Sequence, residues 1–97
     1  MQAVVAVFKM DRALFAVQQR GLKERIVPFV KSQPGFVAGY WSYDHAAAKS
    51  YSFILLDTED AARAFVETVT RANSGPNDAG VSLESITPVE VLAESRK

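Results

Sequence analysis

The stretch that decides the fold is PGFVAGYW, residues 34–41. Pro34 must end any helix before it, because the residue that precedes a proline disfavours helical backbone geometry. Gly35 supplies the unusual backbone angles of a turn, and a strand opens directly after it. Gly39 leaves a gap on the face that it would share with Trp41, where a helix, a partner chain or a ligand can approach closely. The stretch is therefore a helix end, a turn and the start of a strand, and the question is which way the face of Gly39 and Trp41 points.

The segments around this stretch form a regular order of strands and helices. The five residues 45–49 are enough for a hairpin and far too few for a parallel crossover, so the two middle strands should be antiparallel. Asp57 or Thr58 caps the second helix, whose apolar residues recur at helical spacing. We expect strands over residues 3–9, 36–44, 50–57 and 81–87, and helices over residues 12–32 and 58–73. The order β-α-β-β-α-β predicts one α+β domain over residues 1–97, a ferredoxin-like sandwich with an antiparallel sheet.

Two prolines predict irregularities within these elements. Pro28 cannot donate to the carbonyl of Glu24, so we expect a kink or a break in the first helix. Pro88 cannot lie in a central strand, so the last strand should bend or bulge near Thr87 and continue in a second piece. The stretch NSGPNDAG, residues 73–80, is typical of a polar loop.

Composition excludes several classes of function. The chain has 97 residues, with 11 basic and 11 acidic side chains, so it lacks the positive charge of a nucleic-acid binder. It has no cysteine, which excludes disulfides, thiolate catalysis and cysteine-ligated metals. No stretch approaches the ~20 apolar residues of a membrane span, and the first ten residues lack the pattern of a signal peptide. We therefore expect a cytoplasmic protein with neither nucleic acid nor membrane as a partner.

The first strand is apolar on both faces, which has a consequence for assembly. Val5 and Val7 share one face, and Val4, Ala6 and Phe8 share the other. Two helices can cover only one face of a four-stranded sheet, and the uncovered face would be a large exposed apolar patch. The simplest cover is a second copy, so we expect a homodimer that packs sheet against sheet, with the bent last strand reaching across to the partner.

The candidate functional residues are aromatic for the most part. Trp41, Tyr43, Tyr51 and Phe53 either line a pocket for a flat aromatic ligand or pack in the dimer core. His45 follows Asp44 at the hairpin, where it is either a proton shuttle or an exposed turn residue. The candidate ligand-binding residues are Trp41, Tyr43, Tyr51, Phe53, Tyr40 and His45. No catalytic set is recognisable, and a single histidine without cysteine predicts no metal site.

A basic residue on the first helix has two interpretations as well. Arg20 stands beside Gly21 and either reaches an anionic substrate group or lies on a solvated face of the helix. The favoured interpretation is the solvated face, with the apolar stem of the side chain lying along the protein surface.

Taken with the spacing above, the stretches VPFVKSQPGFVAGYW, FILLDTEDAARAF and VSLESITPVEVLAES resemble the dimeric α/β-barrel superfamily. Within it, the chain is most similar to small actinobacterial-type proteins of the antibiotic biosynthesis monooxygenase (ABM) group. The resemblance covers nearly the whole chain and implies two copies forming a dimeric α/β barrel.

The resemblance also implies a range of functions. Haem-degrading members carry an Asn at the start of the domain and a His on the second helix, and both are missing here. Polyketide-modifying members use Asn, Trp and Tyr, of which Trp41 and Tyr43 supply the last two. We therefore expect no cofactor, and a small-molecule-binding dimer that acts as a cofactor-independent monooxygenase on an aromatic or polyketide-type compound. The alternative is a non-catalytic ligand-binding or stress-associated barrel dimer.

Overall fold

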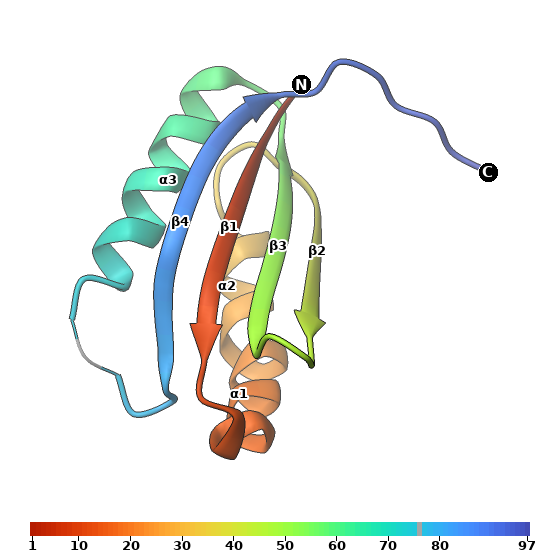
Figure 1. Cartoon of the computed structure of the whole chain (residues 1–97). Helices are drawn as coiled ribbons and strands as arrows, with labels where there is room; N and C mark the ends of the chain where they lie inside the picture. The colour runs from red at the N-terminus through yellow and green to blue at the C-terminus, as the bar shows by residue number, and fades with distance from the viewer. Residues whose placement is uncertain (76) are drawn as a thin grey trace.

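The computed structural model describes residues 1–75 and 77–97, and it has four strands in one antiparallel sheet with all helices on one side (Figure 1). The strand order is β2-β3-β1-β4. The strands are β1 (Gln2–Met10), β2 (Phe36–Asp44), β3 (Lys49–Leu56) and β4 (Val81–Glu90), and the longest helix is α3 (Glu59–Ala72). The predicted ferredoxin-like α+β fold and the element order are confirmed. Of the predicted loop 73–80, Pro76 lies outside the described residues.

The hydrophobic core lies between the sheet and the helices. Val4, Ile54 and Leu56 are fully enclosed, and they meet Phe65 of α3 from the helix side. Trp41 packs against this core as well. The face that carries Gly39 and Trp41 therefore points toward the helices.

The first helical segment runs through Pro28 without the break that the sequence predicts. It consists of a 3-10 turn η1 (Arg12–Leu14), α1 (Phe15–Gly21), a π-helical turn η2 (Leu22–Ile26) and α2 (Val27–Lys31). In η2 the N–H of Val27 reaches back to the carbonyl of Leu22. Pro28 then falls in the first turn of α2, directly after the π turn. The break is therefore absent, and the irregularity near the proline is a wider turn that directly precedes it.

The bulge predicted near Thr87 is found three residues earlier. The register of β4 against β1 shifts between Val7 and Phe8, which leaves Glu84 as the extra residue. Pro88 pairs with Val4 in an unbroken strand. Because β4 is an edge strand, the proline is tolerated there without a bulge of its own. Residues 91–97 form no second strand piece in the single chain and run away from the body (Figure 1).

Glycine is required at the turn that opens β2. Gly35 has φ +79°, and a Cβ there would lie 2.5 Å from a carboxylate oxygen of Asp57. The N–H of Asp57 donates to the carbonyl of Gly35 at 2.9 Å. This turn therefore joins the end of α2 to the end of β3 and fixes where β2 starts. Separately, none of the helices in the described part of the chain is long and apolar enough to span a membrane.

Candidate functional site

A cavity of about 280 Å³ lies between the sheet and the helices. Its walls are mainly apolar, since they come from the inner faces of both layers. From the sheet it is lined by Ala6, Phe8, Trp41, Tyr43, Ser52 and Ile54, and from the helices by Phe15, Gln18, Leu22, Arg25, Val30 and Phe65. This size approaches the lower end of the range for small-molecule pockets, roughly 300–1,000 Å³.

Three further side chains of the cavity wall are apolar and also reach the surface. Val17 is 48% exposed, Ile26 43% and Phe29 47%. The spacing of the apolar residues on the first helix suggests a fully buried stripe. These three side chains show that part of the stripe is exposed instead. Exposed apolar side chains gathered at one place are typical of a ligand or partner surface.

The cavity wall contains two buried polar atoms for which no hydrogen-bond partner exists among the described residues. One is the hydroxyl of Tyr43, on β2. The other is the Oε1 atom of Gln18, on α1, whose residue is only 7% exposed. Buried polar groups are hydrogen-bonded as a rule, so each such atom calls for a partner that the described residues do not supply.

Tyr43 belongs to a cluster of three rings at one end of the cavity. Its ring lies 4.9 Å from that of Phe15 and 4.7 Å from that of His45, centre to centre. Arg12 holds the hairpin tip in place, because its Nη2 donates to the carbonyls of His45 and Ala46 at 3.2 and 3.0 Å. The ring cluster and the arginine thus fasten the β2–β3 hairpin onto the start of the helical segment.

The structure divides the six candidate ligand-binding residues between three places. Trp41 and Tyr43 line the cavity. Tyr40, Tyr51 and Phe53 lie on the opposite, open face of the sheet, where Tyr40 and Phe53 are cross-strand neighbours. His45 lies at the exposed hairpin tip, in contact with the Tyr43 ring and outside the cavity lining.

Two residues of the cavity wall escaped the sequence-based interpretation. Gln18 is a polar residue at an apolar position, since it stands four residues after Leu14 and four before Leu22 on the same helix face. A polar residue at this apolar position was the sequence signal that could have identified Gln18. Arg25 lines the cavity, whereas the arginine singled out from the sequence, Arg20, is exposed and is not among the lining residues. No signal distinguishes the two, because the π turn changes which side chains share a face.

Among the described residues no group of three histidine, cysteine or acidic side chains could hold a metal ion. The cavity also offers few donor atoms to a haem iron. Haem iron takes its protein ligands from His, Cys, Tyr or Met. The described lining contains neither His nor Cys, and of these ligand types it holds only Tyr43 and Met10.

The fold is shared with several solved structures. MhuD of Mycobacterium tuberculosis, a haem degrader solved with two haems in its active site, superposes with a TM-score of 0.76 at 10% identity, over 99% of this chain and 100% of MhuD. A candidate antibiotic biosynthesis monooxygenase from Deinococcus radiodurans has a TM-score of 0.71 at 19% identity, over 100% of this chain and 97% of that one. HapK from Hahella chejuensis has a TM-score of 0.74 at 13% identity, over 100% and 98%.

No protein-family model and no curated protein matches the chain. The solved structures nevertheless confirm the resemblance to the ABM group at the level of the fold. At identities of 10–19%, these superpositions establish the fold only. The activity must be argued from the cavity.

Proposed function

We propose that the protein binds a flat, largely apolar aromatic compound in the cavity between its helices and its sheet. The observation that carries this proposal is an apolar cavity of about 280 Å³ whose wall holds two buried polar atoms without partners among the described residues. Apolar walls favour burial of a ring system, and a few fixed polar groups give orientation. The exposed side chains of Val17, Ile26 and Phe29 provide an apolar entrance.

The binding proposal can be tested through Trp41, which is the only tryptophan of the chain and lines the cavity. Titration with 1,4-naphthoquinone should quench its fluorescence to saturation, because a bound quinone accepts an electron from the excited indole on contact. Ser52 is paired with Trp41 across the strands, so Ser52→Leu adds apolar volume to the cavity wall beside Trp41. This variant should need at least a tenfold higher concentration of naphthoquinone for half-maximal quenching.

The matched control is Thr70→Leu, a change of similar volume on the exposed side of α3. It should bind the quinone as the unaltered protein does. Equal, unsaturable quenching in all three proteins would reflect collisions in solution, and the binding proposal would then be wrong.

We further propose that the bound compound is oxidised without a cofactor. An electron-rich methylene such as that of anthrone can lose a proton and react with O₂: one oxygen atom becomes the new carbonyl, the other leaves as water, and the electrons come from the substrate. Tyr43 is the tyrosine that borders the cavity, so it is our candidate for handling the proton. Oxygen uptake with anthrone should fall in Tyr43→Phe, and an unchanged rate would remove Tyr43 from this role. Absence of uptake with bound anthrone would favour the non-catalytic alternative.

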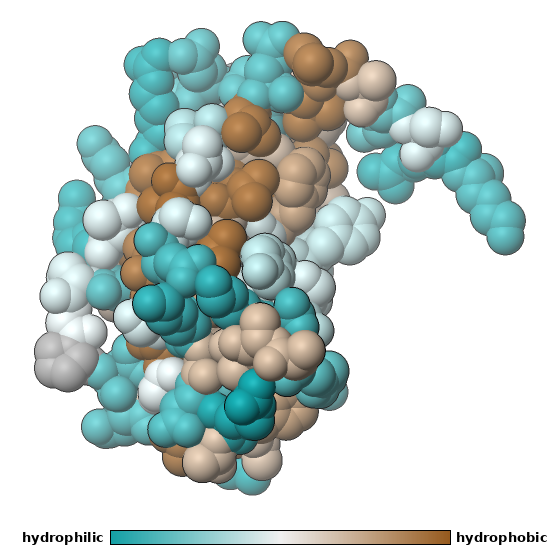
Figure 2. All heavy atoms as spheres, in the orientation of Figure 1, coloured by the Kyte–Doolittle hydropathy of each residue, from teal (hydrophilic) through white to brown (hydrophobic). Residues whose placement is uncertain are grey.

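We propose that the working form is a homodimer assembled through the open face of the sheet. The support is the apolar and aromatic character of that face, where Tyr40, Tyr51 and Phe53 are 57%, 41% and 39% exposed. Figure 2 shows hydrophobic side chains gathered over the upper half of this face. A second copy would cover them without touching the cavity, which lies on the other side of the sheet.

A further inference from the structure

Gln18 is held in one orientation inside the cavity wall. Its Nε2 atom donates to two backbone carbonyls, that of Asp11 at 2.9 Å and that of Ala79 at 2.8 Å. These two bonds use both N–H groups of the amide. They also tie the end of β1 to the segment that leads into β4, so the amide is fixed from two sides.

The orientation of this amide follows from its partners. Rotating the amide by half a turn would bring Oε1 against two carbonyl oxygens, and oxygen atoms without a hydrogen between them repel one another. Oε1 must therefore face away from both carbonyls. It is buried there, and it accepts no hydrogen bond from any described residue. Gln18 lines the cavity, and its Oε1 is a fixed hydrogen-bond acceptor with no exposed surface and no donor among the described residues, so a ligand donor reaches it only when the surrounding side chains move aside.

The other unpartnered atom of the wall places no such demand on a ligand. The hydroxyl of Tyr43 can donate or accept and can rotate to suit whatever group approaches it. An amide oxygen can only accept. Of the two residues, Gln18 is the one that distinguishes a ligand with a donor from a ligand without one.

We propose that Gln18 is a specificity-determining residue that selects aromatic ligands carrying a hydroxyl or N–H group. The proposal rests on the proposed function, since it assumes that the cavity binds an aromatic compound. A site that contains a buried acceptor rejects a ligand of the same shape that lacks the donor, because the acceptor then stays unpaired. A water molecule that remained on Oε1 with ligand bound would remove this selectivity.

The test compares two ligands of nearly equal shape, 2-naphthol and 2-methylnaphthalene, by calorimetric titration of the full chain. The methyl compound is the more easily taken out of water, so an indifferent apolar cavity would prefer it. We expect 2-naphthol to bind about tenfold more tightly or better, as the loss of a buried hydrogen bond implies. Gln18→Leu should reverse this preference. Gln19→Leu is the control, since Gln19 lines the same cavity and has no orphaned buried atom, and it should keep the preference.

The outcomes separate this inference from the proposed function. Equal or tighter binding of 2-methylnaphthalene by the unaltered protein would overturn the role of Gln18 and leave aromatic binding intact. Binding of neither compound would overturn both. Should Gln18→Leu fail to fold, because it also loses the bonds to Asp11 and Ala79, a crystal structure of the 2-naphthol complex decides. A hydroxyl within hydrogen-bond distance of Oε1 supports the role, and a hydroxyl elsewhere overturns it.

Discussion

At the scale of single residues, Gly39 shows how closely the cavity wall is packed. A Cβ on Gly39 would lie 2.8 Å from Cη2 of Trp41 and 3.0 Å from Cδ1 of Ile54. Real Cβ atoms do not come so near to other carbon atoms. The absence of a side chain at this position is therefore what lets the indole of Trp41 lie back along its own strand, between the core and the cavity.

We predict that Gly39→Ala lowers the free energy of unfolding by about 1–3 kcal/mol, the usual cost of overpacking a core. The indole ring is large and rigid, so it must rotate toward the cavity to make room. The midpoint of urea unfolding, followed by circular dichroism, measures the loss, and the emission maximum of Trp41 reports the movement of the ring. Gly75→Ala is the control, because nothing lies within 4 Å of a Cβ there. An equal stability of the two variants would contradict the close packing.

At the scale of elements, the π turn η2 places the cation of the cavity wall. Gly21 ends α1 and is buried, and a Cβ on it would lie 2.8 Å from Nη2 of Arg25. The guanidinium group therefore lies across the glycine, at the side of the cavity. π turns occur frequently at functional sites, because they shift side chains out of the regular helical order.

We predict that Gly21→Ala is tolerated and raises the free energy of unfolding by roughly 0.5–1 kcal/mol, the gain of alanine over glycine in a helix. The new methyl group meets only the end of a flexible side chain, which can swing away. The gain is read from urea unfolding. Ala64→Gly, on the exposed side of α3, should show a change of the same size with opposite sign. A large loss of stability in Gly21→Ala would instead mean that Arg25 cannot leave the glycine.

The elements differ in how far the sequence predicts them. The strands follow from short runs of β-branched residues and from alternation, and α3 follows from helical spacing and the capping Thr58, all of which are local signals. The π turn does not, because it arises where a helix that must pass Pro28 also packs on a sheet. The bulge differs from its predicted place for a similar reason. The local signal of Pro88 predicts it near Thr87, whereas its actual place at Glu84 depends on the register of β4 against β1.

The sequence predicts the candidate site only in part. It does not show which face of the sheet the helices cover or which distant segments come together. Alternation along β2 and β3 separates Trp41 from Phe53 once the pairing is known. It does not say which face the helices cover. Gln18 could have been noticed as a polar residue in an apolar stripe, but its two carbonyl partners come from segments 7 and 61 residues away. Such long-range contacts appear only with the fold.

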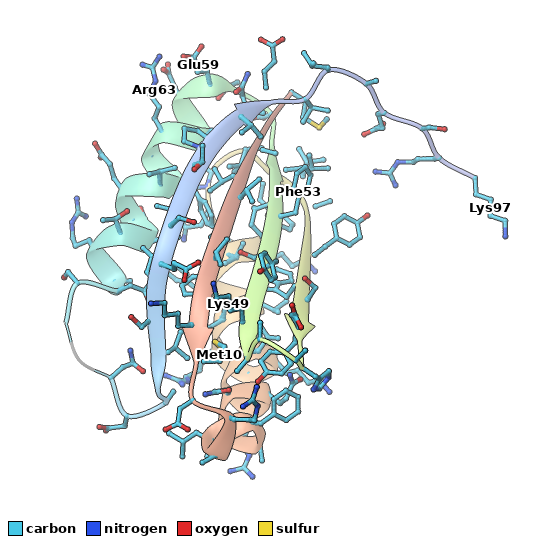
Figure 3. The ribbon with its side chains drawn as sticks, in the orientation of Figure 1. Met10, Lys49, Phe53, Glu59, Arg63 and Lys97 are labelled. Carbon is cyan, nitrogen blue, oxygen red and sulfur yellow. The ribbon has the colours of Figure 1, made fainter. Side chains whose placement is uncertain are left out.

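At the scale of the whole molecule, the sheet has two different faces. The helices cover one face and enclose the cavity. The open face carries Phe53 among aromatic and aliphatic neighbours, with Lys49 toward one end (Figure 3). Nζ of Lys49 donates to Glu84 at 3.2 Å, and this hydrogen bond and the charge of Glu84 raise the pKa of Lys49. The charged pair belongs to the polar end of this face, whose other end is apolar (Figure 2).

We predict that the unaltered protein elutes at twice its chain mass of 10.6 kDa in size-exclusion chromatography with light scattering at micromolar concentration. Phe53→Asp should convert it to a monomer, because a carboxylate would be buried without a partner at the centre of the interface. Thr70→Asp, on the exposed side of α3, should stay dimeric. A monomeric unaltered protein would exclude the sheet-to-sheet dimer. A dimeric Phe53→Asp variant would move the interface elsewhere, for which the edge strand β4 and residues 91–97 are the remaining candidates, since a strand edge can pair with another chain.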